Sequence, residues 1–234
     1  MTETITLTAA GGRMAALFAR PDAAGPHPAV LVMHHRGGLD AFTRQVVEHL
    51  AAAGFAALAP DLYHRRPAAE DRGLSRQHLR DAEIVADIDA ALQGLRTLSE
   101  IRHTDVAILG HCMGGRFAYL GAASFPAFKG AAVFYGGNIF AADSEGGVPP
   151  AALTGNIRCP VMGFFGKEDQ NPSPADVARL DGLLEQHGIR HEFHSYDGAG
   201  HAFQNATNPA SYRATAAEDA WRRVLAFLHR VLPR

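Results

Sequence analysis

Short apolar runs alternate along the chain with longer stretches in which apolar residues recur at helical spacing. The short runs predict buried strands, which cover residues 29–33, 55–58, 106–109, 131–134, 161–165 and 192–196. The helical spacing predicts helices over residues 41–53, 81–98, 113–123, 174–187 and 212–232. Ahead of them, residues 5–21 read as two short strands around a Gly-Gly turn and predict a β-hairpin.

Each predicted helix places apolar side chains on one face. The residues expected to face inward are Phe42, Val46, Val47 and Leu50 in the first helix, Ile84, Ile88, Leu92 and Leu95 in the second, and Trp221, Leu225 and Leu228 in the last. Strands that alternate with helices are typical of a parallel sheet covered on both faces. Because no repeat or long linker interrupts the pattern, we predict one α/β domain over residues 1–234.

The composition fits such a domain and argues against several classes of partner. Hydrophobic residues make up 47% of the 234 residues, enough for a sizeable core. Lys plus Arg number 22 and Asp plus Glu 24, and the resulting net charge of −2 does not favour a nucleic-acid partner. The apolar runs are shorter than a membrane span, and the N-terminus lacks the layout of a signal peptide. We therefore expect a cytoplasmic protein without a membrane partner.

Three of the predicted strands deliver chemically active side chains at their carboxyl ends, where parallel sheets hold their functional loops. "GHCMGG" follows the strand that ends at residue 109, "GKEDQ" the strand that ends at 165, and "DGAGHAF" the last strand. A cysteine, an acid and a histidine therefore emerge in that order. This order is the one expected of an α/β-hydrolase.

Cys112 lies in a Gly-x-nucleophile-x-Gly turn between a strand and a helix, which predicts a sharp bend that lifts its side chain above the sheet. Most free cysteines are small buried apolar residues, but the glycine spacing favours a nucleophile here. The helix N-terminus would lower the thiol pKa, and the N–H of Met113 would bind an oxyanion. Cys159 lacks this setting and is interpreted as structural, and in a reducing compartment we expect no disulfide.

His201, in the Gly-rich loop after the last strand, is the predicted general base. Asp169 is the predicted acid that fixes its tautomer, and Glu168 beside it is the rival. Asp197 is closer to His201 in sequence, but "DGAG" is typical of a turn.

Together these motifs, with "APDLY" at residues 59–63 and "FYGG" at residues 134–137, resemble the dienelactone hydrolase family over nearly the whole chain. The resemblance implies an α/β-hydrolase fold and a hydrolase that cleaves a lactone or ester through Cys112, Asp169 and His201. It implies a small-molecule substrate and no metal or organic cofactor. It also implies a second oxyanion N–H from Arg36. Either a monomer or a small homo-oligomer is compatible with it.

Two positions depart from the family pattern. His35 stands where the family has an activating glutamate, and Asn205 where it has an arginine that binds the substrate carboxylate. His35 could stabilise a thiolate, and Arg36, Arg76 or Arg80 could replace the missing arginine. These departures favour, as an alternative, a broad-specificity carboxylesterase or thioesterase on the same triad. A non-catalytic binding protein on this scaffold is a second alternative.

Other candidates carry weaker signals. Tyr63, His64 and Tyr135 follow strand ends, so they line the pocket or pack at its rim. Two adjacent histidines, His34 and His35, are weak evidence for a metal, and we predict no metal site. Residues 136–155, rich in Gly and Pro, could form part of a lid.

Overall fold

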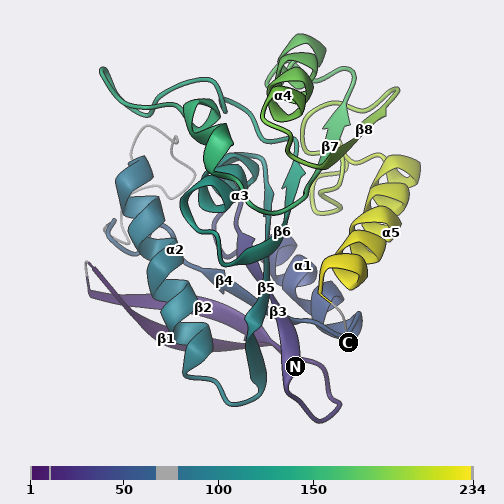
Figure 1. Cartoon of the computed structure of the whole chain (residues 1–234). Coiled ribbons are helices and arrows are strands. Elements are labelled where there is room, and N and C mark those ends of the chain that lie inside the picture. The colour runs from purple at the N-terminus through teal and green to yellow at the C-terminus, as the bar shows by residue number, and fades with distance from the viewer. Residues whose placement is uncertain (1, 11, 67–78, 233–234) are drawn as a thin grey trace.

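The computed structural model describes residues 2–10, 12–66 and 79–232, and these residues build an eight-stranded sheet in the order β1-β2-β4-β3-β5-β6-β7-β8 (Figure 1). The strands are β1 (Thr2–Ala9), β2 (Gly12–Ala19), β3 (His27–Met33), β4 (Ala56–Pro60), β5 (Ile101–His111), β6 (Phe128–Phe134), β7 (Val161–Gly166) and β8 (His191–Tyr196). Strands β1 and β2 pair antiparallel as a hairpin, and β2 also pairs antiparallel with β4. All other neighbouring strands are parallel. The predicted fold class and the predicted hairpin are confirmed.

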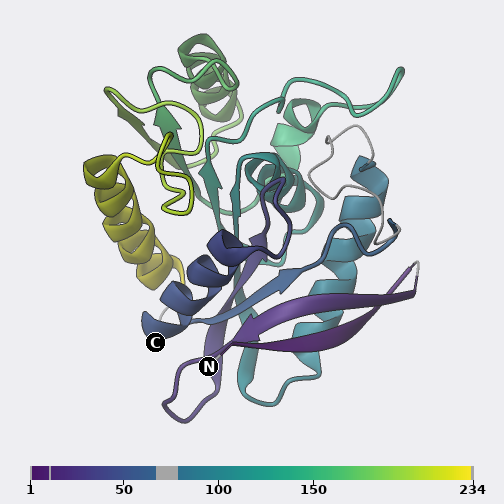
Figure 2. The same ribbon diagram turned by 180° about the vertical axis from the view of Figure 1, so that it is seen from behind.

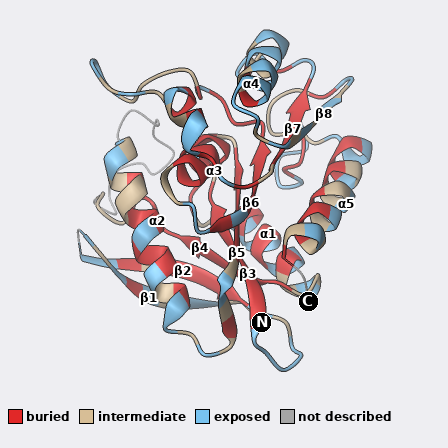
Figure 3. Ribbon diagram, viewed as in Figure 1, coloured by how far each residue is buried: buried red, intermediate tan, exposed pale blue. Residues whose placement is uncertain are grey.

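The helices are α1 (Ala41–Ala52), α2 (Asp81–Arg96), α3 (Met113–Ser124), α4 (Pro174–Gln186) and α5 (Ala214–Val231), and Pro150–Asn156 forms a 3₁₀ helix, η2. One layer of the core holds α2, α3 and α4 against the sheet, and the other holds α1 and α5 (Figures 1 and 2). Along β3 the side chains alternate between the two layers: Leu31 enters the first and Val32 the second. The central strands are therefore buried throughout (Figure 3).

The inward face of α5 is wider than the predicted one. Its buried residues are Ala216, Ala217, Ala220, Val224, Phe227 and Leu228. Trp221 and Leu225 are half-buried and pack against the same layer of the core, so they lie on the inner side as predicted, at its margin. The three alanines were not predicted, and their small side chains let the helix approach the sheet closely.

The segment from residue 136 to residue 155 is tied to the body of the protein at several points. Arg116 of α3 is fully buried, forms an ion pair with Asp81 and donates from Nε to the carbonyl of Asn138 at 3.1 Å. The hydroxyl groups of Tyr119 and Thr154 lie 2.6 Å apart in the core. A lid role for this segment stays a prediction. No helix in the described part of the chain is long and apolar enough to cross a membrane.

Candidate active site

Cys112 joins the end of β5 to the first turn of α3 in a conformation that is rare for residues with a side chain. Its φ of 56° and ψ of −121° lie outside the usual regions, which costs about 1–3 kcal/mol in typical cases. The bend is held because Cys112 N–H donates to the Phe134 carbonyl at 2.9 Å, while its own carbonyl accepts from Gly115 N–H at 2.9 Å. The half-buried thiol side chain packs against both layers of the core.

The glycines around this bend allow α3 to press onto three strands. A Cβ atom on Gly115 would lie 2.7 Å from the Phe134 carbonyl oxygen. On Gly110 it would collide with the backbone of Gly114, and on Gly114 with that of Met33. The close approach places the N-terminus of α3 beside the carboxyl ends of β3 and β6.

The structure brings three predicted residues, from the ends of three strands, into one hydrogen-bonded chain. Nε2 of His201 lies 2.9 Å from Sγ of Cys112, and Nδ1 lies 2.8 Å from Oδ2 of Asp169. Asp169 is 3% exposed, whereas the His201 side chain is 37% exposed. The carboxylate of Asp169 is thus shielded from solvent, whereas the imidazole in the middle of the hydrogen-bonded chain is accessible to it.

Asp169 and its neighbour Glu168, in the loop after β7, differ in burial. Oδ1 of Asp169 accepts from Asn171 N–H at 2.9 Å, which leaves Oδ2 for the histidine. Glu168 is exposed. The acid that faces His201 is therefore Asp169.

Charge and hydrogen bonding favour an ion pair between the thiol and the imidazole. Burial alone would raise the pKa of Cys112, but the hydrogen bond and charge of His201, the Met113 N–H and the Arg36 charge lower it below its usual value. Burial would lower the pKa of His201, yet its hydrogen bonds to Asp169 and Cys112 raise it to about 10. A thiolate beside an imidazolium is the state that these contacts stabilise.

His35 does not join this chain. Its Nε2 lies 2.8 Å from Oδ2 of Asp40, the residue that caps α1, and its ring meets Phe42 edge to face. In the described part of the chain His35 makes no hydrogen bond to Cys112. The imidazole is bound by the carboxylate of Asp40, so any effect of His35 on the thiol would act through its charge, and this role stays a prediction.

The Tyr63 hydroxyl and the Asn205 amide oxygen both make hydrogen bonds within the protein, and a role of either residue in substrate binding stays a prediction. The Tyr63 hydroxyl donates to the Arg36 carbonyl at 3.0 Å and lies 3.7 Å from the Met113 sulfur. Oδ1 of Asn205 accepts from both the N–H and the hydroxyl of Thr207, which stabilises the loop after His201. Sequence position alone could not predict these contacts.

Tyr135 contacts His201, whereas Arg36 and Arg80 do not take part in the hydrogen-bonded chain. The Tyr135 ring meets His201 edge to face at 5.2 Å, and its buried hydroxyl has no hydrogen-bond partner among the described residues. Arg36 is exposed next to the site, and Nη1 of Arg80 donates to the Asp143 carbonyl at 3.3 Å. Arg76 lies outside the described residues.

The sequence did not distinguish His34 or His111 as part of this region. Leu62 N–H donates to Nε2 of His34 at 3.0 Å, and Nδ1 of His34 lies 2.7 Å from the His35 carbonyl oxygen, so neither nitrogen is free for a metal. His111, next to the nucleophile, is buried and hydrogen-bonded to Gln204. Burial lowers the pKa of His34 to about 4 and that of His111 to about 3. The described residues hold no group of three or more potential metal ligands.

Comparison with known proteins gives the family. The model of the dienelactone hydrolase family matches residues 14–232. The chain belongs to the dienelactone hydrolase family. A solved family structure, titled "Putative Dienelactone Hydrolase" from Klebsiella pneumoniae, superposes with a TM-score of 0.91 at 28% identity over 98% of both chains. The predicted α/β-hydrolase fold is thus confirmed.

Curated family members are similar over nearly their whole length. A "Putative carboxymethylenebutenolidase" from Synechocystis sp. is 33% identical over 95% of this chain and 94% of its own. A "Probable 2-oxo-3-(5-oxofuran-2-ylidene)propanoate lactonase" from Bradyrhizobium sp. is 33% identical over 91% of this chain and 88% of its own. The prediction of a hydrolytic enzyme of this family is confirmed.

Proposed function

We propose that this enzyme hydrolyses a small lactone or carboxylic ester, with Cys112 as nucleophile, His201 as acid and base, and Asp169 as the group that orients His201. The observation that carries the proposal is the continuous hydrogen-bonded chain from Asp169 through His201 to the sulfur at the bend. The names of the curated relatives support a lactone or ester as substrate. The hydrogen bond from His201 and the charges around Cys112 lower the pKa of its thiol and support an activated thiolate.

In the first half of the reaction the thiolate of Cys112 attacks the substrate carbonyl carbon, and the π electrons move to the oxygen. The N–H groups of Met113 and Arg36 stabilise the resulting oxyanion. When the intermediate collapses, the bond to the leaving oxygen breaks and that oxygen takes the proton from Nε2 of His201. A thioester remains, and in a lactone the released hydroxyl stays attached to the acyl chain.

In the second half, water attacks the thioester carbonyl and gives a proton to Nε2 of His201, which is now neutral. The second tetrahedral intermediate expels the Cys112 thiolate and releases the carboxylic acid. Asp169 keeps Nδ1 protonated throughout, so that Nε2 is the atom that exchanges protons. The 37% exposure of the His201 side chain supports access of water to this nitrogen.

A broad-specificity esterase or thioesterase on the same residues is the second candidate. One observation favours it: Asn205, which stands where an arginine would bind a substrate carboxylate, uses its amide oxygen within its own loop. An amide also lacks the charged two-pronged grip of a guanidinium. Initial rates on an anionic dienelactone and on neutral aryl esters distinguish the two candidates.

The test of the mechanism is Cys112→Ala, which should abolish hydrolysis of both substrate types and keep the fold. Cys159→Ala is the matched control, since Cys159 is buried in the core and burial raises its pKa to about 12. It should leave the rate unchanged. Full activity in Cys112→Ala would end the proposal, and slow alkylation of Cys112 at pH 6 would favour a non-catalytic binding protein instead.

A further inference from the structure

We propose that His34 and Tyr63 are positioning residues that hold the peptide groups on either side of Arg36 and thereby aim the Arg36 N–H at the oxyanion. This inference rests on the proposed function, in which that N–H is the second oxyanion donor. Both side chains are nearly fully buried, at 1% and 3% exposure, so each acts through the backbone that it contacts.

The hydrogen bonds of His34 fix which of its nitrogens carries the proton. Leu62 N–H donates to Nε2 at 3.0 Å, so Nε2 is an acceptor and has no hydrogen. Nδ1 therefore carries the proton of the neutral ring and donates it to the His35 carbonyl at 2.7 Å. The imidazole thus transmits the position of residue 62 to the backbone of residue 35.

That carbonyl determines the direction of the oxyanion donor. The His35 C=O and the Arg36 N–H belong to one planar trans peptide group, in which they point in opposite directions. A second donor, Gly38 N–H, reaches the same carbonyl at 3.0 Å. Because His34 and Gly38 both donate to the His35 carbonyl, the Arg36 N–H is held pointing in the opposite direction.

Tyr63 fixes the next peptide group. Its hydroxyl donates to the Arg36 carbonyl at 3.0 Å, and the same hydroxyl lies 3.7 Å from the sulfur of Met113, the residue that supplies the first oxyanion N–H. Tyr63 thus lies between the two predicted donors. The peptide group before Arg36 is held by His34, which Leu62 fixes in turn, and the one after Arg36 is held by Tyr63, so both depend on residues that follow β4.

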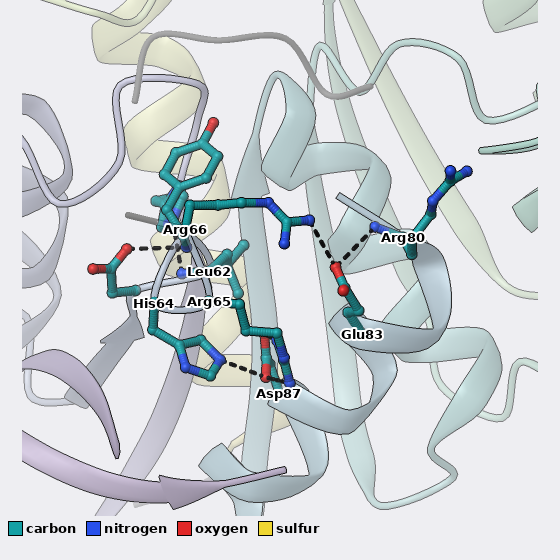
Figure 4. A network of polar contacts seen from close by, with 10 residues as sticks. Leu62, His64, Arg65, Arg66, Arg80, Glu83 and Asp87 are labelled. Carbon is teal, nitrogen blue, oxygen red and sulfur yellow. Dashed lines mark hydrogen bonds and ion pairs between the residues drawn. The ribbon is translucent and has the colours of Figure 1, made fainter. Parts of the chain in front are cut away.

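The turn after β4 is itself fastened to α2, as Figure 4 shows. Asp87, a fully buried carboxylate, accepts two hydrogen bonds of 2.7 Å from Arg65 and lies 3.1 Å from Nε2 of His64. One turn earlier on α2, Glu83 accepts from Arg66 at 3.0 Å. These contacts fix the position of residues 62 and 63, which hold the backbone of residues 35 and 36.

Two substitutions distinguish the hydrogen bond that His34 donates from the one that it accepts. The amide of Asn can occupy the position of Nδ1 and donate, whereas the longer Gln reaches the position of Nε2 and leaves the His35 carbonyl without this donor. Removal of one oxyanion donor costs about 10²–10³ in turnover, so a misdirected donor should cost about 10–10². We expect His34→Gln to lower kcat on an aryl ester by that factor with KM nearly unchanged, and His34→Asn to restore most of kcat.

A second reaction shows whether the effect is specific. Alkylation of Cys112 by iodoacetamide forms no oxyanion, so its rate should stay within about two-fold of wild type in His34→Gln. His27→Gln is the matched control, because His27 is buried at the opposite end of β3 and contacts a backbone carbonyl at 3.0 Å. If His34→Gln does not fold, Tyr63→Phe gives the same test, with Tyr119→Phe as its control.

The possible outcomes distinguish failure of this inference from failure of the proposed function. Loss of kcat with normal alkylation, rescued by His34→Asn, supports positioning. Wild-type kcat in both His34→Gln and Tyr63→Phe overturns it, and so does a fall in alkylation that matches the fall in kcat. If wild-type hydrolysis does not depend on Cys112, the proposed function itself has failed.

Discussion

The contact between α3 and the end of β3 makes Gly114→Ala the most informative single substitution. The added Cβ would lie 2.6 Å from the His34 carbonyl oxygen and closer still to that of Met33. Both neighbours are backbone atoms, so no side chain can rotate away. Relief requires α3 to move from β3 by a distance on the order of 1 Å, and displacements of that size at a reacting centre cost about 10² in rate.

The displacement falls between the two predicted oxyanion donors. Cys112 and Met113 move with α3, whereas Arg36 stays with the loop after β3. We therefore expect kcat/KM to fall by about 10²-fold. Overpacking of this kind costs about 1–3 kcal/mol, which for a chain of this size lowers Tm by about 2–12 °C.

The assay measures ester hydrolysis and thermal unfolding of Gly114→Ala beside Gly182→Ala. A Cβ on Gly182, inside α4, meets nothing within 4 Å. Ala is the better helix former, so this control should gain about 0.5–1 kcal/mol and keep full activity. Wild-type Tm and kcat/KM in Gly114→Ala would refute the reasoning, because they would mean that helix and strand are not pressed together at the active site.

The acid, the thiol and one buried ion pair each give a further measurable outcome. Asp169→Asn should slow ester hydrolysis by about 10³–10⁴, whereas Glu168→Gln should not, and the reverse result would identify Glu168 as the acid. Because His201 lowers the pKa of Cys112, the thiolate should persist to lower pH than in an ordinary cysteine and be lost as pH falls through the lowered value; a pH profile of alkylation with its midpoint at or above that of an ordinary cysteine would contradict this. Asp81→Ala removes the charge partner of a buried arginine and should cost about 3–5 kcal/mol, or about 6–20 °C in Tm, and an unchanged melting curve would argue against it.

Periodicity and glycine spacing predicted most of the fold because both reflect local requirements. The run at residues 106–109 identified β5, but the strand begins at Ile101, whose pairing with His27 of β3 adds polar residues that no apolar pattern includes. On α5 the apolar pattern identified Leu228 but not Ala216, Ala217 and Ala220, because small residues are buried there by their contact with the sheet.

The candidate site was predictable where a side chain follows a strand end, and unpredictable where its partner is decided in three dimensions. Cys112, Asp169 and His201 meet because parallel strands deliver them to one edge. His35 and His34 are adjacent in sequence, yet His35 binds the carboxylate of Asp40 while His34 is buried and binds the backbone of residues 35 and 62. The sequence alone does not distinguish the roles of these two histidines.

Several expectations stay predictions. They are a single domain over residues 1–234, a cytoplasmic location, a monomer or small homo-oligomer, and the lack of nucleic-acid and membrane partners. Size measurement in solution tests the oligomeric state, and fractionation of the source cell tests the location.

The sulfur at the bend has one more property, which comes from its contact with both layers of the core. Loosening of α1 and α5 on one side of the sheet, or of α2 and α3 on the other, exposes the same atom. Heat inactivation should therefore coincide with melting of whichever layer is weaker.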